Sequence, residues 1–246
     1  MSRQRLDVLL LERGLFDSRE QARAAVLAGE VRADGRPVSK PGMQVSEAVE
    51  LIVLARPRFV SRGGEKLDHA LDRFGLDVAG RSVVDIGVST GGFTDCLLQR
   101  GAARVIGVDV GYGQIDYRLR VDPRVVLLER TNARYLTALP VPVSMAVIDV
   151  SFISLRKVLG PVRDLIEPGG EIVALVKPQF EAERGEVGKG GIVRDPLTHA
   201  RVIGRVVRWC VTHGLRVRGL TISPILGGEG NREFLIWLQP DRDEAV

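Results

Sequence analysis

The sequence predicts an α/β protein in which a seven-stranded, mostly parallel sheet follows a small α+β domain. Beyond residue 64, strand-like apolar runs alternate with helix-length segments, which is typical of a parallel sheet covered on both faces. The last two runs are separated only by residues 223–232, too few for a crossover helix, so they should pair antiparallel. The length of 246 residues suits one core of average size with a small appendage.

The composition is that of an ordinary globular protein, with 45% hydrophobic and 27% charged residues. No apolar run could span a membrane, and residues 8–11 are too short for a signal-peptide core, so we expect a cytoplasmic protein. Cys96 and Cys210 are far apart and the three histidines are scattered, so we expect neither a disulfide framework nor a metal site. Residues 1–62 hold 11 Lys and Arg against 8 Asp and Glu, which is consistent with a polyanionic partner.

Residues 1–55 are expected to form the small domain, with two helices packed on a small sheet. Ser18 begins a capping-box pattern at the start of the second helix. The Asp34-Gly35 dipeptide indicates the turn of a hairpin. The expected elements are helices over 3–13 and 18–29, a hairpin over 31–38 and a further strand over 45–54.

Several residues of this segment match a known RNA-binding domain. They are Arg3, Arg5-Leu6-Asp7, Ser18-Arg19, Ala22, Gly29, Val31, Asp34-Gly35 and Lys40-Pro41-Gly42. With them the segment resembles the domain first known from ribosomal protein S4, which implies that arginines of its helices face an RNA backbone. The residues expected to contact RNA are Arg3, Arg5, Arg19, Arg23, Lys40 and Arg62. The alternative is a solvated charged face on a helix pair.

Residues 56–64 are expected to form a linker, because Pro57 and the paired Gly63 and Gly64 interrupt both regular patterns. Residues 65–246 would form the larger domain. Its strands are expected at 82–86, 104–109, 125–128, 145–149, 171–176, 215–222 and 233–239. Seven strands with a reversed last one are typical of the Rossmann-like sheet of S-adenosylmethionine-dependent methyltransferases, and not of all-parallel nucleotide dehydrogenases.

A glycine-rich turn follows the first of these strands, within residues 83–95. Glycine allows a backbone to come within contact distance of a ligand. The spacing differs from the G-x-G-x-x-G fingerprint, so a methionine moiety fits better than a pyrophosphate. The residues expected to bind S-adenosyl-L-methionine are Asp85, Gly87, Ser89, Gly91, Gly92, Phe93, Asp109, Asn132 and Asp149. The alternatives are that Asp85 braces the turn and that Asn132 is an ordinary turn residue.

Seven short motifs are spread along the larger part of the chain. They are SRGGEKL (61–67), DIGVSTGGFTD (85–95), GVDVGYGQ (107–114), DVSFISL (149–155), VKPQFE (176–181), GKGGIVRD (188–195) and GNREF (230–234). With these motifs the chain resembles the TlyA-type family of ribosomal RNA 2′-O-methyltransferases, also called haemolysin A, whose catalytic domain is related to the FtsJ methyltransferases. The resemblance implies methyl transfer to a ribose 2′-hydroxyl of ribosomal RNA, on a cytidine of the small or the large subunit or of both.

Four ionisable residues lie at the edges of apolar segments: Lys66, Asp149, Lys177 and Glu233. The resemblance implies that they form a catalytic Lys-Asp-Lys-Glu tetrad. In it, Lys177 would contact and deprotonate the 2′-hydroxyl, and the other three would set its protonation and orientation. The alternative is that Asp149 and Lys177 are strand-end charges that reach solvent and that Glu233 is an edge-strand polar residue.

Residues 179–196 form a long, charged and glycine-rich segment directly after Lys177, which we interpret as a substrate-side lid; a disordered insertion is the alternative. Two other functions remain for the whole chain. A membrane-active haemolysin, as the older family name suggests, predicts an exposed apolar or amphipathic segment. A non-catalytic RNA-binding protein predicts loss of the tetrad.

Overall fold

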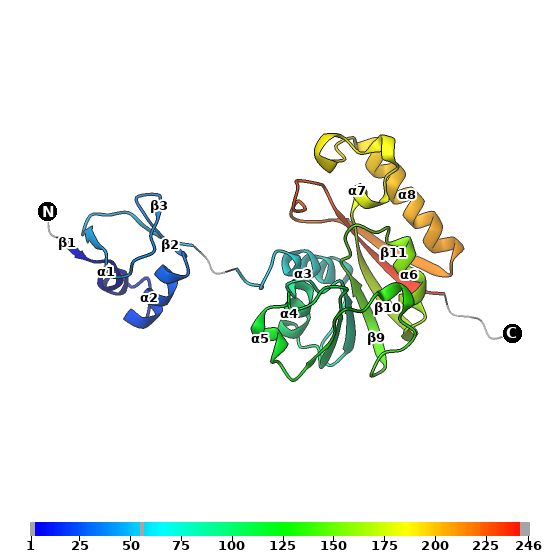
Figure 1. The fold of residues 1–246 in the computed structure, drawn as a ribbon, viewed down its shortest axis with the longest axis horizontal. Coiled ribbons are helices and arrows are strands. Elements are labelled where there is room, and N and C mark those ends of the chain that lie inside the picture. Colours follow the sequence, from blue (N-terminus) through cyan, green and yellow to red (C-terminus); the bar gives the residue numbers. More distant parts are fainter. Residues whose placement is uncertain (1–2, 55–56, 242–246) are drawn as a thin grey trace. The chain divides into compact units, whose positions relative to one another are not determined.

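The computed structural model describes residues 3–54 and 57–241. The chain divides into two compact units, Met1–Pro57 and Arg58–Val246 (Figure 1). The boundary expected between residues 55 and 56, and both ends of the chain, lie outside the described residues.

The first unit packs two helices against short strands. Its elements are β1 (Arg3–Arg5), α1 (Leu6–Glu12), α2 (Arg19–Leu27), β2 (Val31–Ala33), β3 (Arg36–Pro37), β4 (Gln44–Ser46) and β5 (Leu51–Val53). Strand β1 pairs with β4, and β2 lies between β3 and β5, all antiparallel. Leu6, Leu10, Ala22 and Val26 are fully buried between the helices and the strands. The apolar face predicted from helical spacing therefore forms the core of this unit.

Two expected elements of the first unit differ from the structure. The helix expected over 3–13 begins at Leu6, because residues 3–5 pair with β4 as a strand. The strand expected over 45–54 is divided into β4 and β5, since the backbone turns where the Val49 N–H donates to the Ser46 carbonyl at 3.0 Å. The Ser18 cap and the Asp34-Gly35 hairpin are confirmed: the Ser18 hydroxyl accepts from the Gln21 N–H at 3.2 Å, and β2 pairs with β3.

The second unit holds a seven-stranded sheet. Its first half contains α3 (Gly63–Phe74), β6 (Ser82–Ile86), α4 (Gly92–Gln99), β7 (Arg104–Val108), α5 (Tyr117–Arg120), β8 (Val125–Leu128) and the 3₁₀ turn η1 (Ala133–Tyr135). Its second half contains β9 (Val143–Ile148), α6 (Arg156–Arg163), β10 (Ile166–Val176), α7 (Pro178–Glu181), the 3₁₀ turns η2 (Arg184–Glu186) and η3 (Lys189–Gly191), α8 (Pro196–Thr212), β11 (Leu215–Ile222) and β12 (Phe234–Pro240).

The strand order is β11-β12-β10-β9-β6-β7-β8. Strand β12 lies between β10 and β11 and is antiparallel to both, whereas the pairs among β10, β9, β6, β7 and β8 are parallel. This confirms the predicted reversal of the last strand. Strands β7 and β9 each end one residue earlier than expected, so Asp109 and Asp149 lie just beyond a strand and not within it.

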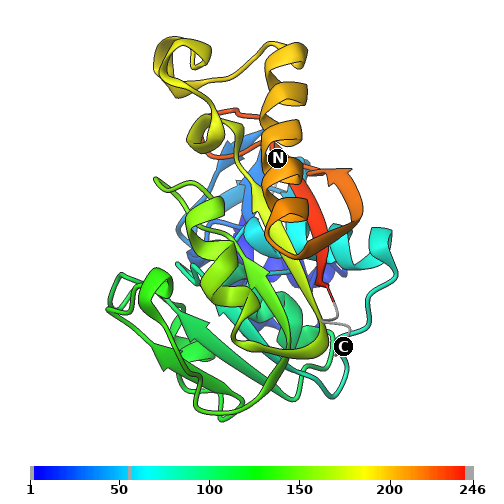
Figure 2. The same ribbon diagram turned by 90° about the vertical axis from the view of Figure 1, so that its right-hand side faces the viewer.

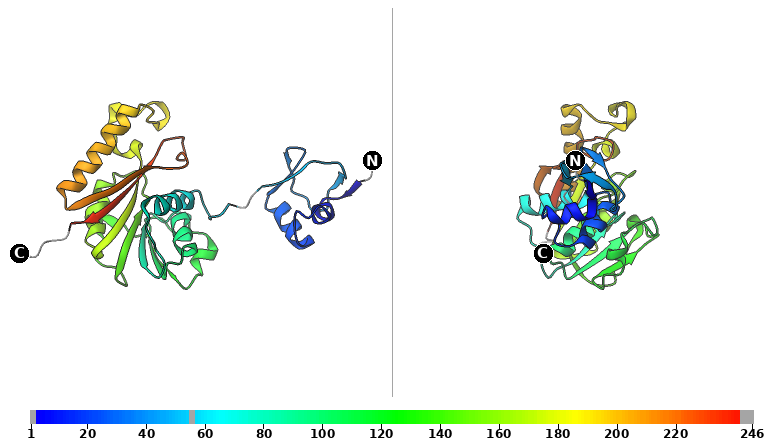
Figure 3. Two further views of the ribbon diagram at one scale, coloured as in Figure 1. Left: turned by 180° about the vertical axis from the view of Figure 1, so that it is seen from behind. Right: turned by 90° about the vertical axis from the view of Figure 1, so that its left-hand side faces the viewer.

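Helices cover both faces of this sheet, and each face carries its own apolar cluster. One cluster includes Leu159 of α6 and Val206 of α8, and the other includes Leu67 of α3 and Leu97 of α4. Helix α8 runs along the end of the sheet formed by β11 and β12 (Figure 2). Helices α3 and α4 lie side by side on the opposite face (Figure 3). Strands covered on both faces explain the nearly continuous apolar runs in the sequence.

Most of the segment expected to be a linker belongs to the second unit. Phe59 is only 4% exposed and packs into the cluster that contains Leu67. Helix α3 begins at Gly63, inside the range 56–64. A buried aromatic anchor and a helical turn therefore fix the position of residues 59–64 against the sheet that they precede.

Candidate active site

Three of the four tetrad residues lie in a row at one edge of the sheet. Asp149 follows β9, Lys177 follows β10, and Glu233 precedes β12. Strand β10 lies between the other two, and its last residue, Val176, pairs with Phe234 of β12. The carboxyl ends of parallel strands meet at one edge, and an antiparallel neighbour begins there, so these charges gather where open α/β sheets bind ligands.

The fourth residue, Lys66, comes from the first turn of α3 and pairs with Glu233, so that the four residues form two ion pairs. Lys66 Nζ lies 2.5 Å from Oε2 of Glu233. Lys177 Nζ lies 2.6 Å from Oδ1 of Asp149 and donates a hydrogen bond of 2.8 Å to the Ser151 hydroxyl. Each lysine thus has its own carboxylate, an arrangement that residue spacing alone did not indicate.

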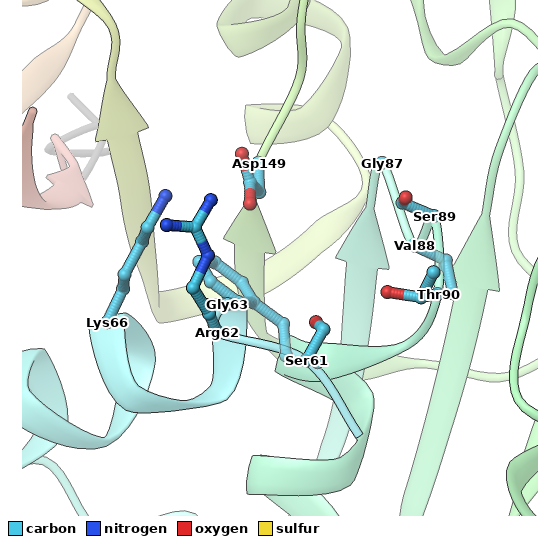
Figure 4. Close-up of a pocket in the computed structure, with 11 residues that line it drawn as sticks. Ser61, Arg62, Gly63, Lys66, Gly87, Val88, Ser89, Thr90 and Asp149 are labelled. Atoms are coloured by element: carbon cyan, nitrogen blue, oxygen red, sulfur yellow. The ribbon is translucent and has the colours of Figure 1, made fainter. Parts of the chain in front are cut away.

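A small pocket of about 190 Å³ connects two of the tetrad residues to the glycine-rich turn, whereas Lys177 and Glu233 line neither this pocket nor the larger one beside it. Lys66 and Asp149 both line the small pocket. The other lining residues are Ser61, Arg62, Gly63, Gly87, Val88, Ser89, Thr90, Gly92 and Phe93. Lys66 and Arg62 extend from the α3 side of this pocket toward Asp149, and Thr90 lies across from them (Figure 4). The start of α3 is therefore part of the site.

A larger pocket of about 500 Å³ shares Gly87, Ser89 and Asp149 with the smaller one. Its remaining lining is Ile86, Val108, Asp109, Val110, Gly111, Gln114, Thr131, Asn132, Ala133, Val150, Ser151, Phe152, Ile153 and Val158. Asp149 therefore lies where the two pockets meet, and its carboxylate contacts Lys177. A volume of this size is ordinary for a pocket that holds a small organic molecule.

The turn after β6 has the close backbone approach expected of a ligand cradle. Gly87 has φ +88°, and a Cβ atom there would lie 2.4 Å from the Asp149 carbonyl oxygen. Only glycine therefore lets β6 and β9 end side by side at the rim of both pockets. Gly91, with φ +96°, caps the N-terminus of α4, whose first two residues, Gly92 and Phe93, line the smaller pocket.

Asp109 and Asn132 both line the larger pocket. The Asp109 carboxylate accepts from the Gly111 N–H at 2.7 Å and from the Ser89 N–H at 2.8 Å. It thereby joins the turn after β7 to the turn after β6. The Asn132 side chain accepts from the Arg134 N–H at 3.1 Å, which caps η1 and fixes the amide at the pocket wall.

Asp85 and Gly91, both expected to bind the cofactor, line neither pocket; Gly91 packs against Ile115 and Leu119. Asp85 lies deeper than the turn itself. It is fully buried within β6. The Thr94 hydroxyl donates to its Oδ2 at 2.6 Å, which ties β6 to α4. Burial raises the pKa of the Asp85 carboxyl to about 7. The structure therefore places Asp85 beneath the turn as a brace, the alternative weighed for it.

The residues expected to contact RNA fall into two groups. Arg3, Arg5, Arg19, Arg23 and Lys40 are exposed on the first unit. Arg5 and Arg19 both pair with the buried Asp7. Arg62, expected in the linker, is instead the residue that precedes α3 and lines the small pocket.

Sequence reasoning assigned no individual role to three residues that the structure places at the site or directly behind it. Ser151 contacts Lys177, and Phe152, with φ +62° and 91% exposure, lines the larger pocket and packs against Phe180 with ring centroids 5.1 Å apart. Glu181 is buried, and its carboxylate accepts from the Ser154 hydroxyl at 2.8 Å and from the Leu155 N–H. The loops after β9 and β10 are thus linked. Their only signal was membership of the motifs at 149–155 and 176–181.

The segment expected to be a lid is built from α7, η2 and η3. Asn231 is fully buried beside it. The Asn231 amide donates to the Gly191 carbonyl at 3.0 Å, and its oxygen accepts from the Val193 N–H at 2.9 Å. These bonds tie the segment to the turn that leads into Glu233.

Among residues 3–54 and 57–241, no helix is long and apolar enough to cross a membrane.

Comparisons with known proteins match both units of the chain. The model of the FtsJ-like methyltransferase family matches residues 59–240, and that of the S4 domain matches residues 4–51. The rRNA methyltransferase candidate YqxC of Bacillus subtilis is 51% identical, over 96% of this chain and 85% of that protein. The 16S/23S rRNA (cytidine-2′-O)-methyltransferase TlyA of Mycobacterium tuberculosis is 48% identical, over 99% of this chain and 92% of that protein.

A solved structure agrees with these relatives. It is a hemolysin candidate from Streptococcus thermophilus, which superposes with a TM-score of 0.75 at 45% identity and covers 98% of this chain and 90% of that one. The matches extend over nearly the full length and include both the S4 domain and the tetrad-bearing sheet. The chain therefore belongs to the TlyA/haemolysin A family of FtsJ-like methyltransferases with an N-terminal S4 domain.

Proposed function

We propose that this protein transfers a methyl group from S-adenosyl-L-methionine to the 2′-hydroxyl of a cytidine in ribosomal RNA, in the small subunit, the large subunit or both. The Mycobacterium tuberculosis relative is named for this reaction. The observation that carries the proposal is the position of Lys177: its Nζ contacts Asp149 and Ser151, which line a cavity bounded by the glycine-rich turn. The substrate lies with the ribosomes, so we place the protein in the cytoplasm.

The lining of the two pockets fits the methyl donor. Gly87 lets the turn after β6 approach the Asp149 backbone at the rim of both pockets, Asp109 offers carboxylate oxygens, and Asn132 offers an amide. When bound, S-adenosyl-L-methionine supplies a methyl group already activated on a sulfonium sulfur. Gly87, Ser89, Gly92 and Phe93 would hold it along the turn, and Asp109 and Asn132 would hold it in the larger cavity.

The tetrad residues would act on the RNA hydroxyl. Lys177 would contact the 2′-oxygen at its Nζ and, in its neutral amine form, take the hydroxyl proton to become an ammonium that Asp149 stabilises. Asp149 and Ser151 also fix the direction of that Nζ. Lys66 and Glu233 would hold the neighbouring strand end in register through their own buried pair. Fixing the nucleophile in line with the reacting carbon contributes much of the rate in a transfer of this kind.

The direct test incubates the full-length protein with labelled S-adenosyl-L-methionine and purified small or large ribosomal subunits, followed by mapping of 2′-O-methylated nucleotides. We expect label at a cytidine 2′-oxygen, and far slower labelling with the matched control Lys177→Met. The absence of methyl transfer to either subunit by the wild-type protein would contradict the proposal. Vesicle lysis that survives Lys177→Met would favour the haemolysin alternative. Cofactor binding measured by calorimetry separates an enzyme from a non-catalytic RNA-binding protein.

A further inference from the structure

Asp7 is a buried carboxylate in the first unit that the proposed reaction does not use. It is fully buried, yet it contacts two arginines whose side chains are 44% and 48% exposed. Arg5 donates from Nε to Oδ1 and from Nη2 to Oδ2, both at 3.0 Å. Arg19 donates from Nε to Oδ2, also at 3.0 Å. A single carboxylate therefore holds two guanidinium groups at the surface of this unit.

The backbone around Asp7 keeps this arrangement in place. The Asp7 N–H donates to the Pro41 carbonyl at 2.9 Å, which ties the start of α1 to the turn that follows Lys40. A Cβ atom on Gly42 would lie 3.1 Å from Nη1 and Nη2 of Arg5, so the guanidinium packs against the backbone of this turn. Glycine at position 42 leaves the room that the guanidinium occupies.

Electrostatics keep the carboxylate charged. The hydrogen bond from Arg5 is the largest cause that lowers the pKa of Asp7 below its ordinary value, and the Arg19 guanidinium acts in the same direction. The arginines that meet Asp7 from β1 and α2 thus keep it ionised near neutral pH, so it serves as a permanent acceptor between them.

The contacts made to Asp7 leave other arginine N–H groups directed elsewhere. An arginine carries five N–H donors in a rigid fork. The bonds to Asp7 use Nε and Nη2 of Arg5 and Nε of Arg19, so within the described part of the chain Nη1 of Arg5 and both Nη atoms of Arg19 keep donors for another partner. Planar guanidinium groups with fixed orientation are well suited to bind phosphate oxygens.

We propose that Asp7 is a positioning residue that preorganises Arg5 and Arg19 to bind backbone phosphate of the RNA substrate. The inference rests on the proposed function, since it takes RNA as the ligand. It also predicts the opposite of the usual effect of removing a negative charge on RNA affinity. If the arginines acted only as free positive charges, removing Asp7 would strengthen RNA binding. If Asp7 positions them, its removal weakens binding, because two long side chains must then be ordered on association.

The experiment measures the affinity of the full-length protein for purified ribosomal subunits at fixed ionic strength, for wild type, Asp7→Asn and Glu20→Gln. Glu20 is a matched control, since it is exposed on α2 beside Arg19 and its substitution removes the same charge. We expect Asp7→Asn to weaken binding about three- to tenfold, as the loss of side-chain ordering implies. Glu20→Gln should bind at least as tightly as wild type. Unchanged or tighter binding by Asp7→Asn, or equal weakening by both variants, would overturn the inference.

A second variant protects the test against a folding defect. Arg19→Lys keeps the charge but loses the fork, so it should weaken binding even though Asp7 is present. The double variant with Asp7→Asn should weaken binding by less than the product of the two single effects, because both substitutions disrupt the same interaction between Asp7 and Arg19. A product of independent effects would refute the positioning role.

Steady-state kinetics separate a binding defect from general destabilisation, because destabilisation would not change KM alone. The effect of Asp7→Asn should be on KM for the subunit and not on kcat, because the first unit docks the RNA and does no chemistry; an equal fall in kcat would contradict this. Wild-type protein that does not bind ribosomal subunits would overturn the proposed function and this inference together. Wild-type binding that Asp7→Asn leaves intact would overturn the inference alone.

Discussion

Lys66 and Glu233 are separated by 167 positions in the sequence, yet Nζ of the lysine lies 2.5 Å from Oε2 of the glutamate. Their side chains are only 10% and 3% exposed. The pair joins the first turn of α3 to the start of β12, beside the strand end that carries Lys177. Because this short ion pair is buried, the geometry of the site depends on the position of α3.

Breaking this pair should destabilise the second unit. Lys66→Met leaves a buried carboxylate without its counter-charge, and we expect a loss of about 3 kcal/mol in the free energy of unfolding. Urea unfolding followed by tryptophan fluorescence measures this unit specifically, because both tryptophans, Trp209 and Trp237, lie in it. The double variant Lys66→Met/Glu233→Leu should lose less than the sum of the two single variants. Strict additivity would mean that the two side chains do not interact.

Substitutions at Lys177 and Ser151 should separate proton transfer from orientation. Lys177→Met removes the group that we propose takes the hydroxyl proton, so single-turnover methyl transfer should fall by about 10² or more. Ser151→Ala removes one hydrogen bond of 2.8 Å to Nζ, and we expect a smaller loss, about fivefold. Calorimetry should show that both variants still bind the methyl donor. A Lys177→Met enzyme with a nearly normal rate would remove this lysine from the mechanism.

Stability should fall with rising pH because of Asp85. Burial raises the pKa of this carboxyl to about 7 in the folded protein, while the unfolded chain has its ordinary value of 3.8. Between these values the folded state keeps a proton that the unfolded state has lost, so stability falls as the pH rises through this window and levels off above about pH 7. Asp85→Asn removes this contribution. The free energy of unfolding of the variant, relative to that of wild type, should therefore increase as the pH rises from about 5 to about 8. A constant difference would show that Asp85 does not titrate there.

Asn231 should hold the segment that follows Lys177. Asn231→Asp keeps the shape of the side chain but replaces the amide donor to the Gly191 carbonyl with an oxygen. We expect faster trypsin cleavage after Lys189 and Arg194 and slower methyl transfer. Cleavage after Arg23, in the other unit, serves as the internal reference and should not change. Equal cleavage of the segment in wild type and variant would show that these hydrogen bonds do not hold it.

The sequence predicted the second unit more closely than the first. The run 82–86 matches β6, because a strand buried on both faces leaves a continuous apolar signal, and the run 125–128 matches the edge strand β8. In the first unit the strands are two or three residues long. Their pairing is decided by partners distant in sequence, so Arg3–Arg5 read as the start of a helix although it pairs with Gln44–Ser46.

Some features of the candidate site could likewise be predicted from the sequence, and others could not. Sequence determined which residues stand at strand ends and where the backbone needs glycine, because run length, turn chemistry and charge are local properties. Only the tertiary structure decided that Lys66 pairs with Glu233, that Lys177 pairs with Asp149, and that Asp85 lies beneath the turn. These relationships depend on the insertion of β12 beside β10 and on the packing of α3 against the sheet. They are contacts between segments far apart in the chain. The burial of apolar faces brings these segments together, and an apolar pattern in the sequence does not indicate which segment it packs against.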